Sequence, residues 1–312
     1  MNSLSAPRRG RLYRRLAADA AALGRPPRPA AAADPVTGAD LAGLPVAARR
    51  YLTFMEVAGR PPDWSLLAHL TGRFRLHPRL PWMRCEAWQY NTSPAVTRLF
   101  HMRLRMAGVL PMTGRDAYTA GHGRMHGQLA GLIPVAAGAG PEYDVSELVT
   151  YLNDAVLLAP SMLLSLPITW DHVSDSAFDL TLSDAGHQVT ARVSVDGRGA
   201  PTDFSTDDRW CELPGGLVRT RWSTPVQGWM KINGRWQPSR GAAVWQLPGG
   251  PFCYAEFRFA PGALAHNTAP ADHAPASPAP PPPPRYPPPG QRGGGLRRAD
   301  RPEPATASGG RP

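Results

Sequence analysis

Lysine, paired cysteines and long apolar runs are all scarce in this chain of 312 residues. Lys231 is its single lysine, so nearly all positive charge is arginine, which is typical of a genomic compositional bias. Cys85, Cys211 and Cys253 are widely spaced and form no Cys-x-x-Cys pair, which argues against a zinc knuckle and a disulfide framework. Cysteine used in this way is typical of a reducing compartment, and we therefore expect a cytoplasmic protein.

Segments that would direct the chain to or through a membrane are also missing. No apolar run approaches the length that spans a bilayer. Arginines at positions 8–15 precede an alanine-rich stretch, but that stretch is short and interrupted by Asp19, so it does not match the apolar region of a signal peptide. The sequence predicts neither a transmembrane segment nor export.

Aromatic residues are nearly absent from the two ends of the chain. All nine tryptophans and all eight phenylalanines lie between Phe54 and Phe259. Residues 1–44 contain a single aromatic, Tyr13, and residues 263–312 consist mainly of proline, glycine, alanine and arginine. Such segments bury too little apolar surface to offset chain entropy. We therefore predict a disordered tail over 1–44, a single β-rich domain over 45–262 and a disordered, basic, proline-rich tail over 263–312.

The formal net charge of +10 divides unequally between these parts. The predicted domain carries about +3 and the two tails about +7. A basic surface favours nucleic acid or anionic membrane as a partner. Because most of the excess lies outside the domain, nucleic-acid binding by the folded part is not expected.

Two helices are predicted. Residues 45–58 begin with proline, place apolar residues at helical spacing and end at glycine. In the second helix, Asp144 is placed to cap the N-terminus with Glu147 three residues on, as in a capping box. An apolar stripe follows, and Pro160 ends the helix.

Most of the remaining domain alternates apolar and polar residues, as strands do. In the segment 100–106, Phe100, Met102 and Leu104 alternate with polar residues. The segments 178–182, 189–195 and 204 onward are separated by glycine-containing turns, which are strong hairpin signals. The sequence predicts a mainly β (α+β) fold, namely a curved antiparallel sheet or half-barrel of about ten strands with two helices packed against it.

Several segments, in order along the domain, resemble an uncharacterised bacterial family of unknown function: Leu44–Leu52, Gly72–Arg75, Asp116–Gly123, Glu147–Leu152, Pro160–Leu164, Asp207–Arg209 and Val244–Tyr254. The presumed shape of that family is similar to the half-barrel of LolA-type periplasmic lipoprotein carriers. The resemblance implies a fold and assigns no activity. The chain departs from the family at Thr150, where an arginine is expected, and at Asn153-Asp154, where a glutamate is expected.

Motifs that carry recognised chemistry are few. His122 and His126 are four residues apart, but the glycines around them argue against a helix, and in a strand they would be about 13 Å apart. No metal site is therefore expected. Ser161 lies in no Gly-x-Ser-x-Gly elbow and is better explained as part of a turn, and Cys85 fits a packed core thiol. Without a glycine-rich phosphate loop or dinucleotide fingerprint, no cofactor is predicted.

The leading hypothesis is a binding module in which the concave face of the sheet holds a hydrophobic or lipid-like small molecule. Large aromatic residues on a curved sheet would line an apolar pocket, whereas in an ordinary domain they would simply form the core. We select Trp88, Tyr118, Trp170 and Trp245 as lining residues, and Arg75 or Arg103 as partners of an acidic head group at the rim. The sequence leaves the oligomeric state open.

Two alternatives remain. The first is an enzyme of unidentified class that uses Asp116, Tyr118 or Arg209 in the same cavity. Asp116 and the Asp207-Asp208-Arg209 segment are as easily explained as a turn cap or a structural ion pair. The second is a scaffold whose basic tails tether it to membrane or nucleic acid.

Overall fold

The computed structural model describes residues 10–24, 33–106, 109–260 and 262–270. Within them the helices are α1 (Arg11–Ala22), α2 (Gly38–Ala42), α3 (Val46–Phe54), α4 (Pro141–Leu158) and a 3₁₀ helix, η1 (Pro160–Ser165). The first strands are β1 (Ser65–Phe74), β2 (Met83–Thr92), β3 (Thr97–Met106), β4 (Leu110–Thr119), β5 (His122–Leu129) and β6 (Ile133–Ala139). After α4 follow β7 (Ile168–Ser174), β8 (Ala177–Asp184), β9 (His187–Val195), β10 (Pro201–Thr206), β11 (Trp210–Leu213) and β12 (Gly216–Arg219). The last are β13 (Trp222–Ser223), β14 (Val226–Ile232), β15 (Arg235–Leu247), β16 (Gly250–Arg258) and β17 (Leu264–His266).

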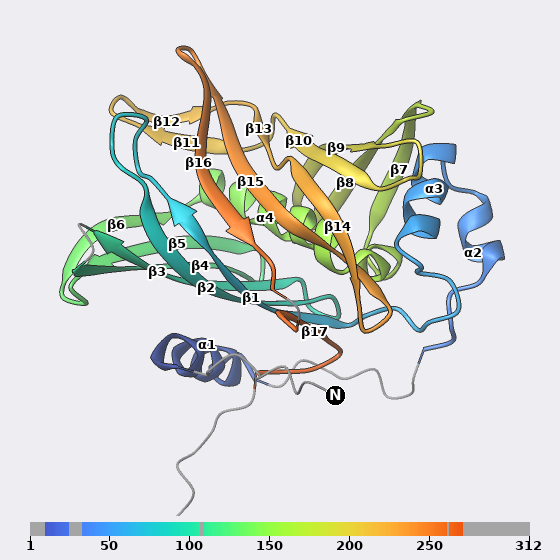
Figure 1. The fold of residues 1–312 in the computed structure, drawn as a ribbon, viewed down its shortest axis with the longest axis horizontal. Coiled ribbons are helices and arrows are strands. Elements are labelled where there is room, and N and C mark those ends of the chain that lie inside the picture. Colours follow the sequence, from blue (N-terminus) through green and yellow to red (C-terminus); the bar gives the residue numbers. More distant parts are fainter. Residues whose placement is uncertain (1–9, 25–32, 107–108, 261, 271–312) are drawn as a thin grey trace, which may run out of the picture. The chain divides into compact units, whose positions relative to one another are not determined.

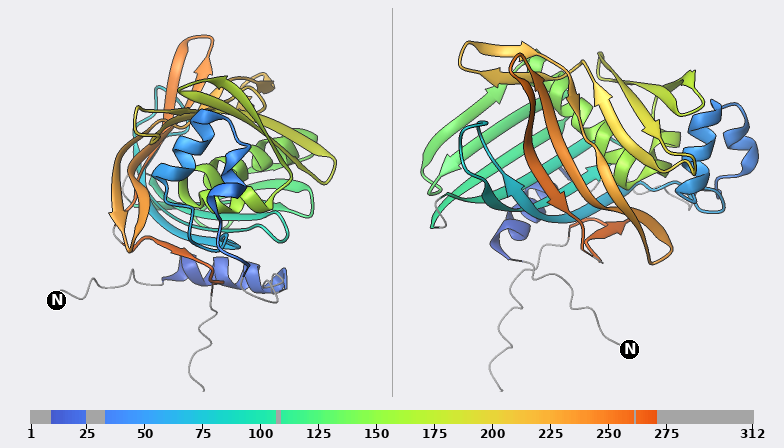
Figure 2. Two further views of the ribbon diagram at one scale, coloured as in Figure 1. Left: turned by 90° about the vertical axis from the view of Figure 1, so that its right-hand side faces the viewer. Right: turned by 45° about the horizontal axis from the view of Figure 1, so that its top comes forward.

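One large antiparallel sheet organises the molecule. Its strand order is β6-β5-β4-β3-β2-β1-β16-β15-β13-β10-β9-β8-β7, with β14 paired to β15 and β17 paired to β1. Neighbouring strands are mostly consecutive in sequence, so short turns connect them, whereas α4 joins the two ends of this path (Figure 1). β6 and β7 do not pair with each other, so the sheet curves without closing (Figure 2). β11 and β12 form a separate two-stranded sheet.

The expectation of a mainly β fold with a curved antiparallel sheet is confirmed, but the predicted numbers of elements are too small. The large sheet contains 15 strands in the described residues, and there are four α-helices where two were predicted. The extra strands are short or hidden in segments without clear alternation, such as β13 and β17. No helix of the described chain is long and apolar enough to cross a membrane.

Order extends beyond both predicted domain limits. In the segment 1–44, α1 and α2 are helical, and α1 buries Leu12, Tyr13, Leu16, Ala17 and Ala20. These residues form one helical stripe that packs across β2 and β3 on the outer face of the sheet. Beyond residue 262, β17 pairs with β1. The rest of both predicted tails lies outside the described residues.

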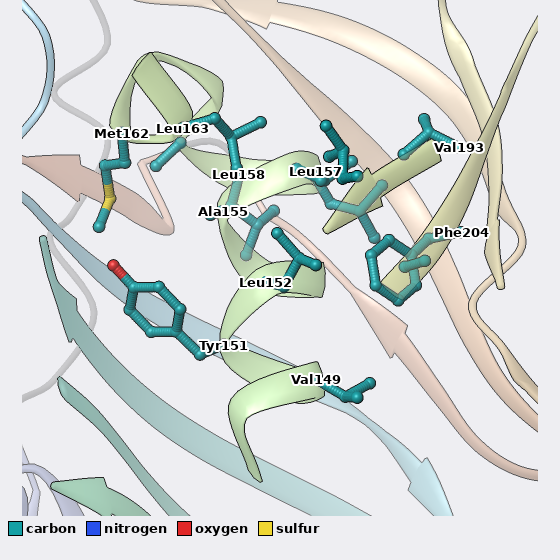
Figure 3. Close-up of a cluster of buried hydrophobic side chains, with 14 of the residues drawn as sticks. Val149, Tyr151, Leu152, Ala155, Leu157, Leu158, Met162, Leu163, Val193 and Phe204 are labelled. Atoms are coloured by element: carbon teal, nitrogen blue, oxygen red, sulfur yellow. The ribbon is translucent and has the colours of Figure 1, made fainter. Parts of the chain in front are cut away.

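Helix α4 lies inside the curve of the sheet and is buried on almost every side. Pro141 occupies its first turn, and Glu142 and Asp144 in that turn suit the positive end of the helix dipole. Figure 3 shows Tyr151 on one side of α4 and Leu157 on the other, toward Val193 and Phe204 of the second half of the sheet. The two halves of the sheet therefore share a single core built around this helix.

Candidate functional site

A cavity of about 620 Å³ lies between α4 and the inner face of the sheet. This volume is within the range of roughly 300–1,000 Å³ that is usual for small-molecule sites. Most of the lining is apolar or aromatic and includes Leu70, Phe74, Phe100, Met102, Leu104, Met112, Leu157, Trp222, Trp245, Phe252, Phe257 and Phe259. The lining also contains charged and polar side chains, and we call one group of them the polar end: Arg98, Asp116, Glu147, Asp154, Arg209 and Tyr254.

Helix α4 contributes a polar stripe to this cavity. Glu147, Thr150 and Asp154 are spaced by three and four residues, so they share one face of the helix. All three are buried. Helix α4 thus turns the carboxyl groups of Glu147 and Asp154 inward rather than toward solvent.

Arg98 of β3 binds both of these carboxylates. Its Nη1 donates to Glu147 Oε2 at 2.8 Å and its Nε donates to Asp154 Oδ2 at 2.7 Å. Asn91 Nδ2 donates to the same Asp154 oxygen at 3.2 Å. Burial opposes the charge of Arg98, but Asp154 and Glu147 outweigh it and raise its pKa. Arg98 is only 4% exposed, so this ion pair fixes α4 to β3 from within the core.

Arg209, just before β11, is the second cation of the polar end. Its guanidinium lies over the ring of Trp222, 4.2 Å from the centroid, and over Trp245 at 5.1 Å. Its Nη1 donates to the Tyr254 hydroxyl at 3.1 Å, while its Nε is buried without a hydrogen-bond partner within the described ranges. Among the described residues, no carboxylate lies within salt-bridge distance of Arg209. Aromatic rings rather than counter-ions hold this cation, as in a cation–π site.

Asp116 of β4 faces the same space and accepts no hydrogen bond from the described residues. Burial raises the pKa of its carboxyl group, and the charges of Arg98 and Arg209 oppose that rise. Burial and the neighbouring Asp116 also raise the pKa of Glu147 to about 7, against the pull of Arg98. The polar end therefore holds three carboxyl groups and two guanidinium groups, and the raised pKa of Glu147 means that this group exchanges a proton near neutral pH.

Four of the eight residues selected from the sequence line this cavity: Arg75, Asp116, Arg209 and Trp245. Trp245 is 8% exposed and stacks on Tyr254 with ring centroids 6.1 Å apart. Arg75 donates from Nε to the backbone oxygen of Cys253 at 2.8 Å and lies over Phe252. The structure brings Asp116, Arg209 and Trp245 together at the polar end.

The other four do not line this cavity. Trp88 points to the outer face of the sheet, where α1 covers it and Tyr13 packs edge-on against its ring. Arg103 lies on the same outer face and donates to Glu86 at 2.6 Å. A shift of one residue along a strand reverses the face, and alternation alone does not say which face is concave.

Tyr118 and Trp170 are core residues away from the cavity. The Tyr118 hydroxyl donates to Asp184 Oδ2 at 2.7 Å, and its ring is fully buried. Trp170 lies on β7, at one end of the sheet path, and stacks on Phe178 with centroids 5.7 Å apart. Tyr118 therefore lies apart from Asp116 and Arg209, with which it was grouped as an acid–base candidate.

Sequence reasoning missed Arg98, Glu147, Asp154 and Tyr254. The predicted capping box at Asp144 and Glu147 is wrong, because α4 begins at Pro141, Asp144 accepts from the Gly123 N–H of β5 at 2.6 Å and Glu147 binds Arg98. A usable signal was present in β3, where Arg98 falls in phase with the apolar residues at 100, 102 and 104. A cation on the core face of a strand calls for buried carboxylates.

The remaining sequence candidates have structural roles. The described residues contain no group of histidine, cysteine and acidic side chains suited to a metal ion. Ser161 Oγ donates to Asp63 Oδ2 at 2.6 Å inside a buried network, and Cys85 packs beside Met83 with its pKa raised to about 12 by burial. Both agree with the turn and the packed thiol that the sequence indicated.

The comparisons with known proteins match most of the chain and do not single out the polar end. A DUF1329 family protein from Desulfovibrio piger matches 71% of this chain and 92% of its own length, at 11% identity and a TM-score of 0.39. A LolA superfamily protein from Nitrosomonas europaea matches 68% of this chain and 91% of its own length, at 11% identity and a TM-score of 0.36. No curated protein sequence matches this chain. A family model, described as a family of unknown function (DUF6544), matches residues 34–257, which include every residue of the polar end, and the chain belongs to that family.

Proposed function

We propose that this protein binds a hydrophobic or amphipathic small molecule, lipid-like in its apolar part, in the cavity between α4 and the sheet. The observation that carries the proposal is a cavity of about 620 Å³ with a mainly apolar lining and one polar end. Apolar burial would supply most of the affinity, at roughly 25 cal/mol per Å² of buried surface, and the polar end would fix the orientation.

Unused hydrogen-bonding groups inside the cavity support a binding role. Asp116 has no protein partner among the described residues, and Arg209 makes a single hydrogen bond, to Tyr254. Buried polar groups normally find partners, because an unpaired one costs about 1–3 kcal/mol. A ligand would supply those partners.

Native mass spectrometry of the full chain, purified from its natural host without detergent, tests this. We expect a discrete added mass that disappears on organic extraction. Gly114→Leu would fill the cavity, because a Cβ at Gly114 meets only the Met102 side chain, at 3.6 Å. That variant should lose the added mass, whereas Gly43→Leu, in open space on the surface, should keep it. Equal retention by both variants would place the bound molecule elsewhere.

A second candidate function is acid–base catalysis in the same cavity. The raised pKa values of Asp116 and Glu147 favour it, because buried carboxyl groups with shifted pKa values are typical of active sites. An activity that is lost in Asp116→Asn, and whose pH profile follows a group near pH 7, would support catalysis. A variant that retains full turnover would exclude Asp116 from it.

A further inference from the structure

The polar end offers hydrogen-bond donors at Tyr254 and Arg209. The Tyr254 hydroxyl accepts from Trp222 Nε1 and from Arg209 Nη1, each at 3.1 Å. Both lone pairs of that oxygen are therefore occupied, and its own hydrogen is left to donate. Arg209 adds further N–H groups, since its guanidinium makes one hydrogen bond to the described residues.

The matching acceptor is Asp116. Its carboxyl group lines the cavity and accepts nothing from the described residues, and Arg98 and Arg209 both act on its charge. A ligand group that contacts Asp116 and Arg209 together must both donate and accept a hydrogen bond. A hydroxyl group does so with one oxygen atom.

The balance of charge decides between head groups of the same size. Two guanidinium groups already face three carboxyl groups. Burial raises the pKa of one of them, Glu147, to about 7, so below that pH this carboxyl holds a proton and the charges of the polar end balance. An anionic head group would add an unbalanced negative charge, so the site would have to take up another proton. A cationic head group would enter beside Arg98 and Arg209. Bringing an uncompensated charge into a buried site costs far more than one hydrogen bond returns.

The apolar lining extends away from the polar end along two paired strands. Phe100 pairs with Asp116 in the register of β3 and β4, and Leu104 pairs with Met112. The distance from Asp116 to Met112 along β4 is about 13 Å, at roughly 3.3 Å per residue. Past Asp116 and Phe100, the side chains on this inner face are Met102, Leu104 and Met112, and none of them is charged.

We infer that the ligand is an uncharged amphiphile whose polar end carries a hydroxyl group, held between Asp116 and the Arg209–Tyr254 pair, with its apolar chain directed along β3 and β4. This inference rests on the proposed binding function and specifies its ligand class. A bound fatty acid would place its carboxylate as the anion beside Arg209. Asp116 already supplies that anion, so the ligand does not need to carry one.

The test compares three ligands with the same ten-carbon chain: 1-decanol, decanoate and decylammonium. Tryptophan fluorescence of the full chain reports binding, because Trp222 and Trp245 line the cavity. At pH 6.5, below the raised pKa of Glu147, we expect decanol to bind at least about tenfold more tightly than either ion. Decanoate affinity should rise by up to about tenfold per pH unit on acidification, since it binds with uptake of a proton, while decanol affinity stays constant from pH 6.5 to 8.

Asp116→Asn removes one negative charge and keeps the shape of the side chain. In this variant decanoate should gain affinity until it binds at least as tightly as decanol, because its own charge then replaces that of Asp116. Asp171→Asn makes the same chemical change on exposed β7 and should leave the preference unaltered. Circular dichroism checks that both variants fold.

The possible outcomes test the uncharged head group and the binding function separately. Tighter binding of decanoate or decylammonium to the wild type, or an unchanged preference in Asp116→Asn, would overturn the uncharged head group and leave the binding function standing. Failure of all three ligands to bind, together with a clean mass of the protein from its host, would overturn the binding function itself.

Discussion

At the scale of single residues, Arg98 is the residue of the site whose loss we expect to lower stability most. It forms ion pairs with both Glu147 and Asp154 at 4% exposure, where each unpaired charge would be costly. A buried pair of this kind adds little net stability compared with apolar residues of the same volume, but loss of one partner is severe. The ion pair therefore sets how α4 is placed against β3 more than how stable the fold is.

Arg98→Met should lower the free energy of unfolding by about 3–5 kcal/mol, because it leaves two buried carboxylates without their cation. The pKa of Glu147, already raised to about 7, then loses the lowering effect of Arg98 and rises further, so stability falls as pH rises and the loss should be larger at pH 8 than at pH 5. Urea denaturation at both pH values measures this. Arg103→Met, on the exposed face of the same strand, should cost no more than about 1 kcal/mol. Equal losses in the two variants would contradict the role of Arg98.

Gly123 is a second position at which a single added carbon atom, a Cβ, is expected to lower stability. A Cβ there would lie 2.1 Å from the backbone oxygen of Tyr143 and 2.8 Å from the Asp144 nitrogen, so the start of α4 rests directly on β5. We expect Gly123→Ala to destabilise the protein by at least about 1–3 kcal/mol through this overlap. Gly114→Ala on the neighbouring strand meets only ordinary contacts and serves as the control. Thermal unfolding compares them, and a Tm of Gly123→Ala no lower than that of the control would refute the close approach.

At the scale of elements, α1 is a cover on the outer face of the sheet. Its apolar stripe packs on Leu67, Trp88, Tyr90 and Leu99, while its arginines face solvent. Under this contact, Trp88 Nε1, Tyr90 Oη and His101 Nδ1 are buried and have no hydrogen-bond partner in the part of the chain that the structure describes. These unpaired groups weaken the attachment of α1 relative to its apolar area.

Acidification should release α1. Burial lowers the pKa of His101 to about 4, outweighing Asp19, which raises it, while Arg115 and Arg15 add to the lowering. Because the docked state holds His101 neutral, docking is fully stable above the unperturbed pKa near 6.5 and loses roughly 3 kcal/mol as pH falls toward 4. Hydrogen exchange of residues 11–22, corrected for intrinsic rates, should show lost protection at pH 5 relative to pH 7. His101→Gln, which cannot titrate, should show no such pH dependence, and a wild type protected equally at both pH values would contradict this account.

At the scale of the whole molecule, contacts between turns hold the open ends of the sheet together. The turn after β4 and the turn between β8 and β9 meet where Tyr118 donates to Asp184, and Asp144 of α4 lies 3.7 Å from both His122 and His187. β6 and β7 share no backbone ladder. Side-chain contacts therefore connect the two parts of the sheet that paired strands would connect in a closed barrel.

Tyr118→Phe should loosen this junction. The phenyl ring keeps the packing but removes the hydrogen bond to Asp184, which costs about 1.5–3 kcal/mol for a charged acceptor. Hydrogen exchange should increase in β7, β8 and β9 before the rest of the sheet. Tyr151→Phe, which removes the hydrogen bond from α4 to the Thr92 oxygen, is the matched control and should not alter those strands selectively. Uniform exchange in both variants would show that the junction is not a separate unit.

Much of the fold could be predicted from the sequence because local patterns decide it. The hairpins at 177–206 follow from alternation and turn residues, and α3 and α4 follow from apolar periodicity and proline positions. Helix α1 escaped prediction because its stripe of alanine, leucine and one tyrosine is too weak to be recognised without the aromatic face that it covers.

The sequence by itself determined a β-rich chain with apolar faces, two well-defined helices and a shortage of catalytic motifs. Tertiary structure alone decided which face of each strand is concave, and with it that Trp245, Asp116 and Arg209 line the cavity while Trp88 and Arg103 lie outside. Alternation separates the two faces of a strand but does not say which face is concave. The partners of Arg98 lie 49 and 56 positions away along the chain, too far for a local pattern to reveal them. Only the curvature of the sheet around α4 brings them together.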